Sequence, residues 1–302
     1  MASPFLKWVG GKRQLIEDIE SRLPEELGAD GNRRYAEPFV GGGVLMFHLF
    51  EKELIDNALI SDLNKDLVNA YRTIREDVSG VISCLESIQE RYDESSQEIR
   101  KEDYFSIRKE FNDRRATFDY DSYSADWCVR SAQMIYLNKT GFNGLFRVNK
   151  SGYFNVPPSD LKNKTILNEE NLLDVSRVLQ NVEIRSGDFS ECSSWVGPGS
   201  FVYFDPPYRP IEKTSFTTYS TNVFDDSEQE RLANFVKELC SRGVRVMVSN
   251  SDPTNTDVKD DYFEKIYSSA DGFSLHKVSA IRSINSKGGG RGAISELLIT
   301  NY

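Results

Sequence analysis

The tetrapeptide Asp205-Pro206-Pro207-Tyr208 combines the residue types best suited to chemistry, and it directly follows the apolar residues 201–204. Its two prolines fix φ and keep Asp205 out of the α region, so we expect a stiff turn. Asp205 and the Pro206 carbonyl can each accept one N–H, and the Tyr208 ring can stack on a planar group. The set therefore fits a planar ligand with an exocyclic amine. A purely structural turn after a buried strand is the alternative interpretation.

Glycines 41–43 form a second candidate site, between a strand-like run and a helix-compatible run. Glycines at such a turn let a ligand approach the backbone beside a helix N-terminus. We therefore take Phe39, Gly41 and Gly43 as candidate cofactor contacts, with a plain tight turn as the alternative. A dinucleotide fingerprint needs a further glycine where Met46 stands, which disfavours a nicotinamide dehydrogenase.

Two further acidic residues follow strand-like runs: Asp62 comes after residues 58–61, and Asp188 comes after residues 182–185. Asp62 at a strand end is placed to hydrogen-bond ribose hydroxyls, although a simple cap of the strand end is the alternative. Asp188 precedes Phe189, whose ring could either cover one face of an adenine or belong to the core. Both are candidate cofactor contacts.

The elements that must position these residues follow an α/β pattern. Strand-like runs occur at 35–40, 58–61, 182–185, 201–204, 244–248 and 296–300, and helices fit at 127–137 and 227–239. Asn64 is a candidate N-cap for a helix between the second and third strands. Residues 75–125 are charge-dense and helical in pattern, and residues 138–149 predict a turn or hairpin. The simplest arrangement is one α/β sheet domain with a helical insertion of about 100 residues.

The 302 residues carry a formal net charge of −10, but their basic residues are unevenly distributed. The windows 1–16, 127–159 and 272–295 contain eleven Lys and Arg residues and no acid, whereas the rest of the chain has a formal charge of −21. Such windows could hold phosphates on an acidic body, because electrostatic contact is screened within about 10 Å. Three ordinary solvated loops are the alternative.

Other classes of protein are disfavoured by what the sequence lacks. It has no apolar run long enough for a membrane span and no signal-peptide pattern, so we expect no membrane association. The four cysteines form no CxxC pair, which favours a reduced, intracellular setting. The two histidines have no metal-ligand spacing, so we expect no metal site.

Seven sequence blocks together make the chain resemble the Dam-type DNA adenine-N6 methyltransferases, including the restriction–modification methylases of that type. The blocks occur in the family's order and span nearly the whole chain. They are Phe5-Leu6-Lys7-Trp8-Val9-Gly10-Gly11-Lys12, Glu37-Pro38-Phe39-Val40-Gly41-Gly42-Gly43, Ser61-Asp62-Leu63-Asn64, Phe142-Asn143-Gly144-Leu145-Phe146-Arg147, Phe154-Asn155-Val156-Pro157, Asp205-Pro206-Pro207-Tyr208 and Arg282-Ser283-Ile284.

The resemblance implies a Rossmann-like S-adenosylmethionine-dependent methyltransferase sheet, formed by residues 1–66 and 168–302. Residues 67–167 would then be an inserted, mostly helical DNA-recognition domain. The implied cofactor is S-adenosyl-L-methionine, at a site to which Trp8, Lys12, Asp62 and Asp205 correspond. The implied partners are double-stranded DNA and, in a restriction–modification system, a cognate restriction endonuclease. Such an enzyme acts on DNA in the cytoplasm.

The resemblance also implies DNA contacts in the block around the predicted hairpin. Arg147 is expected to contact a guanine, and Phe142 is expected near the displaced base stack. The further DNA-facing candidates are Lys139, Asn143, Leu145 and Arg282. Many relatives methylate GATC, which is the expected target. Relatives often continue after Asn-Val-Pro with a Gly-Arg-Tyr-Lys-like stretch, but residues 158–162 read Pro-Ser-Asp-Leu-Lys, which removes an Arg and adds an acid at the expected DNA face.

The expected reaction is transfer of a methyl group to N6 of an adenine that has left the base stack. Asp205 and the Pro206 carbonyl would bind the N6 hydrogens and orient the nitrogen lone pair toward the sulfonium methyl. Positioning and electrostatics would supply most of the rate, with no metal and no covalent intermediate. N4-cytosine methylation by the same pocket, and a catalytically silent DNA-binding regulator on the same scaffold, are the alternatives.

Overall fold

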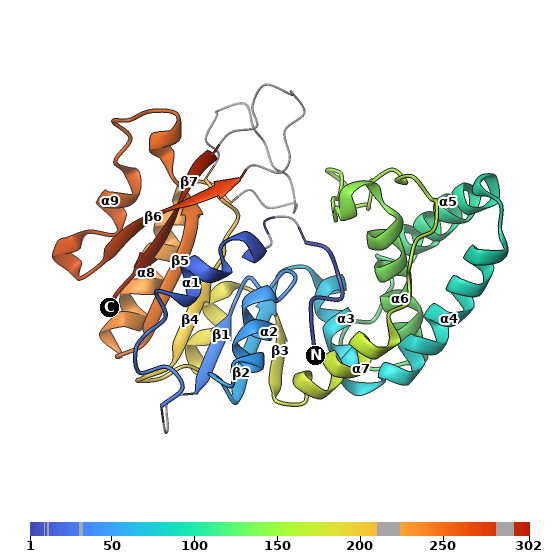
Figure 1. Ribbon diagram of the computed structural model, residues 1–302, viewed down its shortest axis with the longest axis horizontal. Coiled ribbons are helices and arrows are strands. Elements are labelled where there is room, and N and C mark those ends of the chain that lie inside the picture. The colour runs from blue at the N-terminus through green and yellow to red at the C-terminus, as the bar shows by residue number, and fades with distance from the viewer. Residues whose placement is uncertain (9, 11, 30–32, 210–223, 282–292) are drawn as a thin grey trace.

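The computed structural model describes residues 1–8, 10, 12–29, 33–209, 224–281 and 293–302. Its centre is a seven-stranded sheet in the order β3-β2-β1-β4-β5-β7-β6 (Figure 1). Strands β1 to β5 pair in parallel, whereas β7 pairs antiparallel with both β5 and β6. The strands are β1 (Arg34–Glu37), β2 (Asn57–Asp62), β3 (Val182–Ser186), β4 (Phe201–Phe204), β5 (Arg245–Ser251), β6 (Ser274–Ile281) and β7 (Ala293–Thr300). The predicted α/β fold class is confirmed.

The central strands are apolar because both faces of the sheet are covered. All four residues of β4 are buried, and so are six of the seven residues of β5. Continuous apolar runs of this kind are typical of parallel strands buried on both faces. The predicted strand 35–40 is too long at its end: β1 stops at Glu37, because Pro38 has no N–H to donate to the ladder. The strand β6 was not anticipated from the sequence.

Helices flank the sheet and form a separate helical lobe (Figure 1). They are α1 (Ile16–Glu20), α2 (Val44–Glu51), α3 (Lys65–Glu76), α4 (Val78–Glu94), α5 (Gln97–Asp113), α6 (Ala125–Thr140), α7 (Glu169–Leu179), α8 (Asp226–Ser241) and α9 (Tyr262–Ile266). Asn64 is the predicted N-cap of α3, and its side chain accepts hydrogen bonds from the N–H groups of Asp66 and Leu67. The lobe consists mainly of α4, α5 and α6, and α3 joins it to the sheet by packing against α6.

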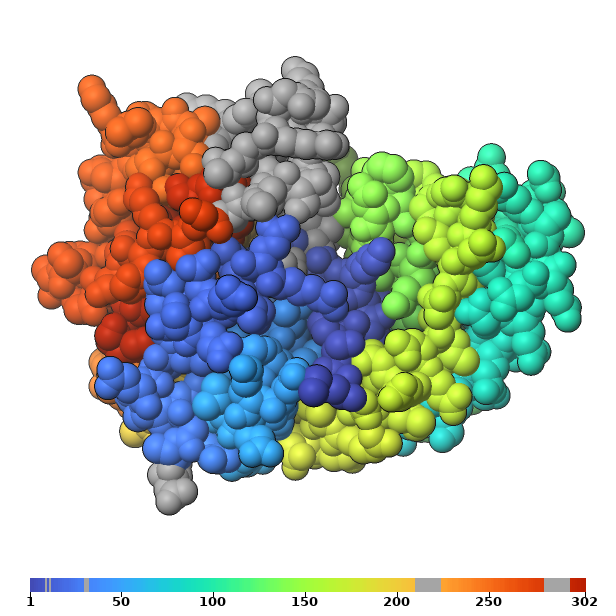
Figure 2. Space-filling view, in the orientation of Figure 1, coloured from blue at the N-terminus to red at the C-terminus, as the bar shows by residue number. Residues whose placement is uncertain are grey.

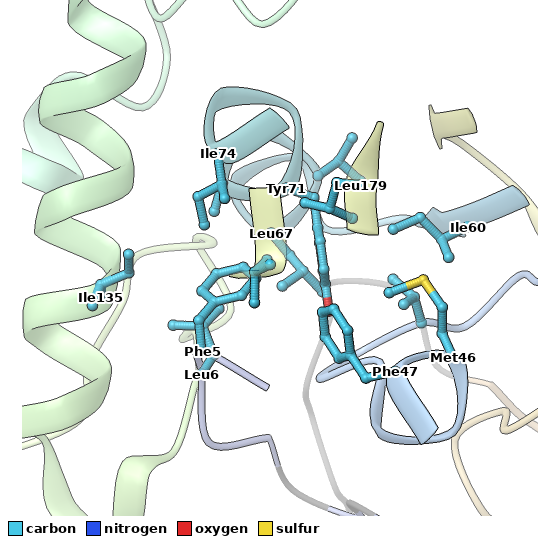
Figure 3. Close-up of a cluster of buried hydrophobic side chains, with 14 of the residues drawn as sticks. Phe5, Leu6, Met46, Phe47, Ile60, Leu67, Tyr71, Ile74, Ile135 and Leu179 are labelled. Atoms are coloured by element: carbon cyan, nitrogen blue, oxygen red, sulfur yellow. The ribbon is translucent and has the colours of Figure 1, made fainter. Parts of the chain in front are cut away.

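The N-terminal segment lies between the sheet and the helical lobe and is held there by the hydrophobic core (Figure 3). Phe5 and Leu6 are both buried in this cluster, with Tyr71 of α3 and Ile135 of α6. The ring of Phe5 meets the ring of Tyr71 edge to face, with centroids 5.0 Å apart. The segment that carries Trp8 and Lys12 is therefore anchored by burial of the residues that precede it.

Candidate active site and DNA-facing segments

Three carboxylates lie at the carboxyl ends of three neighbouring parallel strands. Asp62 ends β2, Glu37 ends β1 and Asp205 directly follows β4. Ligands of open α/β sheets bind at this edge, outside the carboxyl ends of the strands. The fold therefore brings Asp62 and Asp205, which are far apart in the sequence, to one side of the sheet, and it adds Glu37, which the sequence analysis did not single out.

Asp205 forms an ion pair with Lys12. The Lys12 ammonium lies 2.7 Å from Asp205 Oδ1, and the side chains are only 7% and 21% exposed. Lys12 Nζ also donates to the Gly10 carbonyl at 2.7 Å. Burial raises the pKa of Asp205, while the charge of Lys12 opposes that rise. The ion pair thus keeps a carboxylate acceptor at a site that water only partly reaches.

Tyr208 lies beside this ion pair. Its ring centroid is 4.7 Å from Lys12 Nζ, and its hydroxyl donates to Glu296 Oε2 at 2.6 Å. Pro206 is buried, and the Pro207 carbonyl accepts a hydrogen bond of 3.0 Å from the side chain of Gln229 in α8. The structure therefore places Asp205, Pro206 and Tyr208 together on one short segment after β4, and Gln229 braces that segment.

Asp62 serves as a cap at the end of β2. Its Oδ2 accepts the N–H of Gly41 at 3.3 Å, and its Oδ1 accepts the N–H of Asn64 at 2.8 Å. Burial raises the pKa of Asp62 to about 6, although these backbone donors lower it. The strand-cap alternative thus describes part of what Asp62 does. A carboxylate offers about four acceptor positions, so Asp62 can still accept a hydrogen bond from another donor.

The glycine turn between β1 and α2 is closely packed. Gly41 and Gly43 have φ values of +48° and +66°, which favour glycine. A Cβ at Gly41 would lie 2.6 Å from Trp8 Cδ1, and one at Gly43 would lie 2.8 Å from Tyr71 Oη. Trp8 itself stacks on Phe146, with centroids 5.6 Å apart. The space that Gly41 opens is therefore used by Trp8, which connects the glycine turn to the segment expected to bind DNA.

Asp188 and Phe189 have strong protein partners in this structure. Asp188 forms a two-pronged ion pair with Arg231, at 2.9 and 2.7 Å, which helps to lower the pKa of Asp188 to about 2. The Phe189 ring is buried against Phe39, with centroids 5.6 Å apart, and the Arg231 guanidinium lies 4.0 Å from it. The core alternative therefore describes the surroundings of Phe189.

The turn or hairpin predicted at 138–149 is present as a 3₁₀ turn, and a hairpin follows further along the chain. Residues 138–140 end α6, Phe142–Gly144 form a 3₁₀ turn, and the hairpin runs from 147 to 155. Its ladder includes Asn155 N–H to the Arg147 carbonyl at 3.1 Å and Asn149 N–H to the Tyr153 carbonyl at 2.9 Å. The turn glycine is Gly152, with a φ of +80°, because the two earlier glycines belong to the 3₁₀ turn and its flank.

The DNA-binding candidates of this region differ in exposure. Phe142 is 51% exposed, Asn143 is exposed and Leu145 is half-buried. Arg147 is exposed, and its Nε donates to Asn155 Oδ1 at 2.8 Å. Arg282 lies outside the described residues.

Two of the acid-free windows meet in space. Lys7, Arg13 and Lys139 line one cavity of about 460 Å³. Figure 2 shows the blue N-terminal segment next to the green and yellow-green helical lobe. Burial lowers the pKa of Lys139, and the charges of Lys7 and Arg13 lower it further. The expected cationic surface thus has a structural basis, although this cavity is separate from the strand-end carboxylates.

Asn138 joins these two windows and was missed by the sequence analysis. Its buried amide accepts the Lys7 N–H at 2.8 Å and donates to the Lys7 carbonyl at 2.9 Å and the Gly144 carbonyl at 2.8 Å. Glu37 and Glu296 were missed as well. Glu37 stands in a matched block, whereas nothing in the sequence connects Glu296 with Tyr208.

The fold and the site together define the class. The sheet has seven strands, with the antiparallel β7 between β5 and β6, and acidic residues lie at the carboxyl ends of the parallel strands. This is a Rossmann-like methyltransferase fold. Among the described residues, no helix is both long enough and apolar enough to cross a membrane.

Comparison with known proteins identifies the family. The model of the family "D12 class N6 adenine-specific DNA methyltransferase" matches residues 8–284. The chain belongs to this family, and the predicted resemblance is confirmed.

Three relatives match over nearly their whole length. The type II methyltransferase M.MjaIII of Methanocaldococcus jannaschii is 45% identical, over 99% of each chain. The type II methyltransferase M1.LlaDCHI of Lactococcus lactis subsp. cremoris is 37% identical, over 99% of this chain and 95% of its own. A DNA adenine methylase of Vibrio cholerae is 35% identical, over 97% of this chain and 94% of its own.

Proposed function

We propose that this protein transfers a methyl group from S-adenosyl-L-methionine to N6 of an adenine flipped out of double-stranded DNA, with GATC as its target. The observation that carries the proposal is the Asp205-Pro206-Pro207-Tyr208 segment, which is braced by Gln229 at the carboxyl end of β4 and paired with Lys12. Membership of the N6 adenine-specific family supports adenine over cytosine as the methylated base.

The residues around the glycine turn fit the proposed cofactor. Asp62 can accept further hydrogen bonds from hydroxyl groups, and the turn at Gly41 and Gly43 lies directly beside it. Trp8, Lys12, Phe39 and Asp205 border the same sheet edge as the further proposed contacts. Asp188 and Phe189 stay proposed contacts, although Arg231 and the aromatic core already occupy them. The cofactor would supply a methyl group activated by its sulfonium charge.

The turn then supplies orientation. The Asp205 carboxylate and the Pro206 carbonyl accept the two N6 hydrogens, so the nitrogen lone pair is directed to the other side. Within the part of the chain that the structure describes, no donor contacts the Pro206 carbonyl. Tyr208 stacks on the base, and Lys12 favours the ionised form of Asp205. Such positioning in a partly dry site accounts for the rate without a covalent intermediate.

We further propose that residues 67–167 form the DNA-recognition domain and that residues 1–66 and 168–302 form the catalytic domain. Arg147 would read a guanine, and Lys139, Phe142, Asn143, Leu145 and Arg282 would contribute other DNA contacts. The exposure of Phe142 and Arg147 supports this assignment. Two of the relatives are named type II methyltransferases. We therefore propose that this protein works inside the cell together with a cognate restriction endonuclease.

The test is incubation of unmethylated plasmid with the enzyme and cofactor, followed by digestion with GATC nucleases of known methylation sensitivity and by nucleoside mass spectrometry. We expect protection at GATC and N6-methyladenine as the product. N4-methylcytosine would establish the cytosine alternative instead. DNA binding without methyl transfer would establish the regulator, and N6-methyladenine outside GATC would change only the proposed target.

A further inference from the structure

The orientation of the Tyr208 ring depends on a residue far away in the chain. The prolines of the turn restrict the backbone but leave the χ angles of Tyr208 free. The hydroxyl of Tyr208 donates to Glu296 Oε2 at 2.6 Å, a distance typical of a strong bond to a charged acceptor. A carboxylate outside the tetrapeptide therefore holds the far end of the ring.

Glu296 is itself held rigidly. It lies in β7, where it is opposite Ser251 of β5 and Val278 of β6. Its backbone thus belongs to a strand with a neighbour on each side, in the interior of the sheet. On the ring face of Tyr208, the Lys12 ammonium lies 4.7 Å from the centroid and is fixed by Asp205. The ring is consequently held both at its hydroxyl and on one face.

A purely structural role does not explain why a carboxylate stands here. Among the described residues, Tyr208 is the one side chain recorded as a hydrogen-bond donor to Glu296, and no cation forms an ion pair with it. Its negative charge also lies close enough to Asp205 to raise the pKa of that carboxyl. The raised pKa is that of Asp205, and groups with perturbed pKa values are concentrated at functional sites.

We infer that Glu296 is a positioning residue for methyl transfer, because it fixes the Tyr208 ring in the orientation in which a flipped adenine stacks. The inference rests on the proposed function, since it assigns Tyr208 to the target base. Glu296 then acts through Tyr208 and not on the cofactor. Its loss should lower capture of the flipped base and the rate of transfer, and leave cofactor affinity unchanged.

The test compares Glu296→Ala, Glu296→Gln, Tyr208→Phe and the double variant Glu296→Ala/Tyr208→Phe in the full-length enzyme. Single-turnover methyl transfer is measured with labelled cofactor, and base flipping is measured with 2-aminopurine at the target adenine. Glu183→Ala is the matched control, because Glu183 is an exposed glutamate in β3 at the opposite edge of the sheet. Thermal unfolding of each variant reports folding.

We expect Glu296→Ala and Tyr208→Phe each to slow transfer about tenfold and to lower the 2-aminopurine signal, the size of one lost hydrogen bond to a charged group. The double variant should be no slower than either single variant, since both remove the same bond. Glu296→Gln keeps an acceptor oxygen and should stay within about threefold of wild type. Cofactor affinity and the Glu183→Ala enzyme should be unchanged.

Three results would overturn the inference: wild-type transfer and flipping in Glu296→Ala, single effects that multiply in the double variant, or a loss of cofactor affinity with normal flipping. If Glu296→Ala fails to fold, the comparison of Tyr208→Phe with Glu296→Gln still tests the inference. Only Tyr208→Phe removes the hydrogen bond between the two side chains. A wild-type enzyme that transfers no methyl group would instead count against the proposed function.

Discussion

Single residues at the carboxyl edge of the sheet combine two tasks. Asp205 pairs with Lys12 at 2.7 Å and, in the proposed reaction, also accepts an N6 hydrogen of the target adenine. Asp62 accepts two backbone N–H groups and, in the proposed site, also binds ribose hydroxyls. A substitution at either position therefore changes both local structure and ligand binding, and experiments must measure both.

Replacement of Asp205 by Ala should reduce turnover by at least about 100-fold, the scale expected when one positioned transition-state group is lost. The change also leaves Lys12, 7% exposed, without its carboxylate, so the free energy of unfolding should fall. Asp205→Asn keeps an acceptor oxygen and should retain more activity than Asp205→Ala. Turnover with labelled cofactor and thermal unfolding check these outcomes. Turnover of Asp205→Ala within a few fold of wild type would contradict the role of Asp205.

Replacement of Asp62 by Ala should weaken cofactor binding by about 1.5–3 kcal/mol, as expected for a hydrogen bond to a charged group. DNA affinity measured without cofactor should change little. In the wild type, cofactor affinity should fall as the pH drops through the Asp62 pKa of about 6, because a protonated carboxyl accepts fewer hydrogen bonds. Calorimetry at several pH values measures both effects. If Asp62→Ala binds the cofactor with unchanged affinity, Asp62 only caps the end of the strand.

At the scale of elements, the hairpin 147–155 presents two basic residues in different ways. Arg147 lies at its start, with its guanidinium oriented by Asn155, whereas Lys150 is exposed at its turn. A planar guanidinium can meet O6 and N7 of a guanine together, but an ammonium at a loop tip is suited to a phosphate. The same element can thus provide both specificity and general affinity.

Arg147→Ala should cost about 1–3 kcal/mol on the best site and much less on sites that lack the matching guanine, so sequence specificity should relax. Lys150→Ala is the matched comparison and should weaken binding to all DNA sequences alike. The slope of log affinity against log salt concentration should become smaller by about one unit. Methylation rates on single-base variants of GATC at several salt concentrations separate the two. If Arg147→Ala lowers the methylation rate equally on every site, Arg147 contacts the DNA backbone. The hairpin would then not determine sequence specificity.

At the scale of the whole molecule, the N-terminal segment connects the parts that the reaction must bring together. Phe5 and Leu6 belong to the core, Lys7 is bound by Asn138 of α6, and Trp8 packs between Gly41 and Phe146. The N-terminal segment therefore contacts both the sheet edge and the helical lobe, and it lies between them in Figure 1. We therefore expect the sheet and the helical lobe to unfold together, in one transition.

The buried carboxyl of Glu37 should make that global stability depend on pH. Burial raises the pKa of Glu37 from 4.5 to about 8, although Tyr35 donates to it at 2.9 Å. Between these two values the folded protein holds a proton that the unfolded chain releases. The free energy of unfolding should therefore fall as the pH rises through this range, by up to about 1.4 kcal/mol per pH unit from this group.

Glu37→Gln cannot titrate, so its free energy of unfolding should fall less steeply with pH than that of the wild type. Urea unfolding at pH values between the two pKa values gives the slope of the unfolding free energy against pH for each protein. A hydrogen bond lost by the amide lowers that free energy equally at every pH, so it does not change the slope. Equal slopes in the two proteins would show that Glu37 is ionised in the folded state.

Local chemistry determined much of this protein. Strand-like runs predicted β2, β3, β4, β5 and β7, and the Asn64 cap predicted the start of α3. These features depend on neighbouring residues, so a sequence can reveal them. The matched blocks predicted the family in the same way, because each block is short and continuous.

Tertiary structure alone decided the partners. Lys12 meets Asp205, Asn138 meets Lys7, and Glu296 meets Tyr208 because the order of the strands and the antiparallel insertion of β7 bring distant segments together. Neither periodicity nor turn residues predict such a pairing, because the two residues come into contact only when the sheet is assembled. For a related reason the sequence left a turn and a hairpin as alternatives at 138–149: the structure has the 3₁₀ turn Phe142–Gly144 there, and the hairpin turn lies at Gly152.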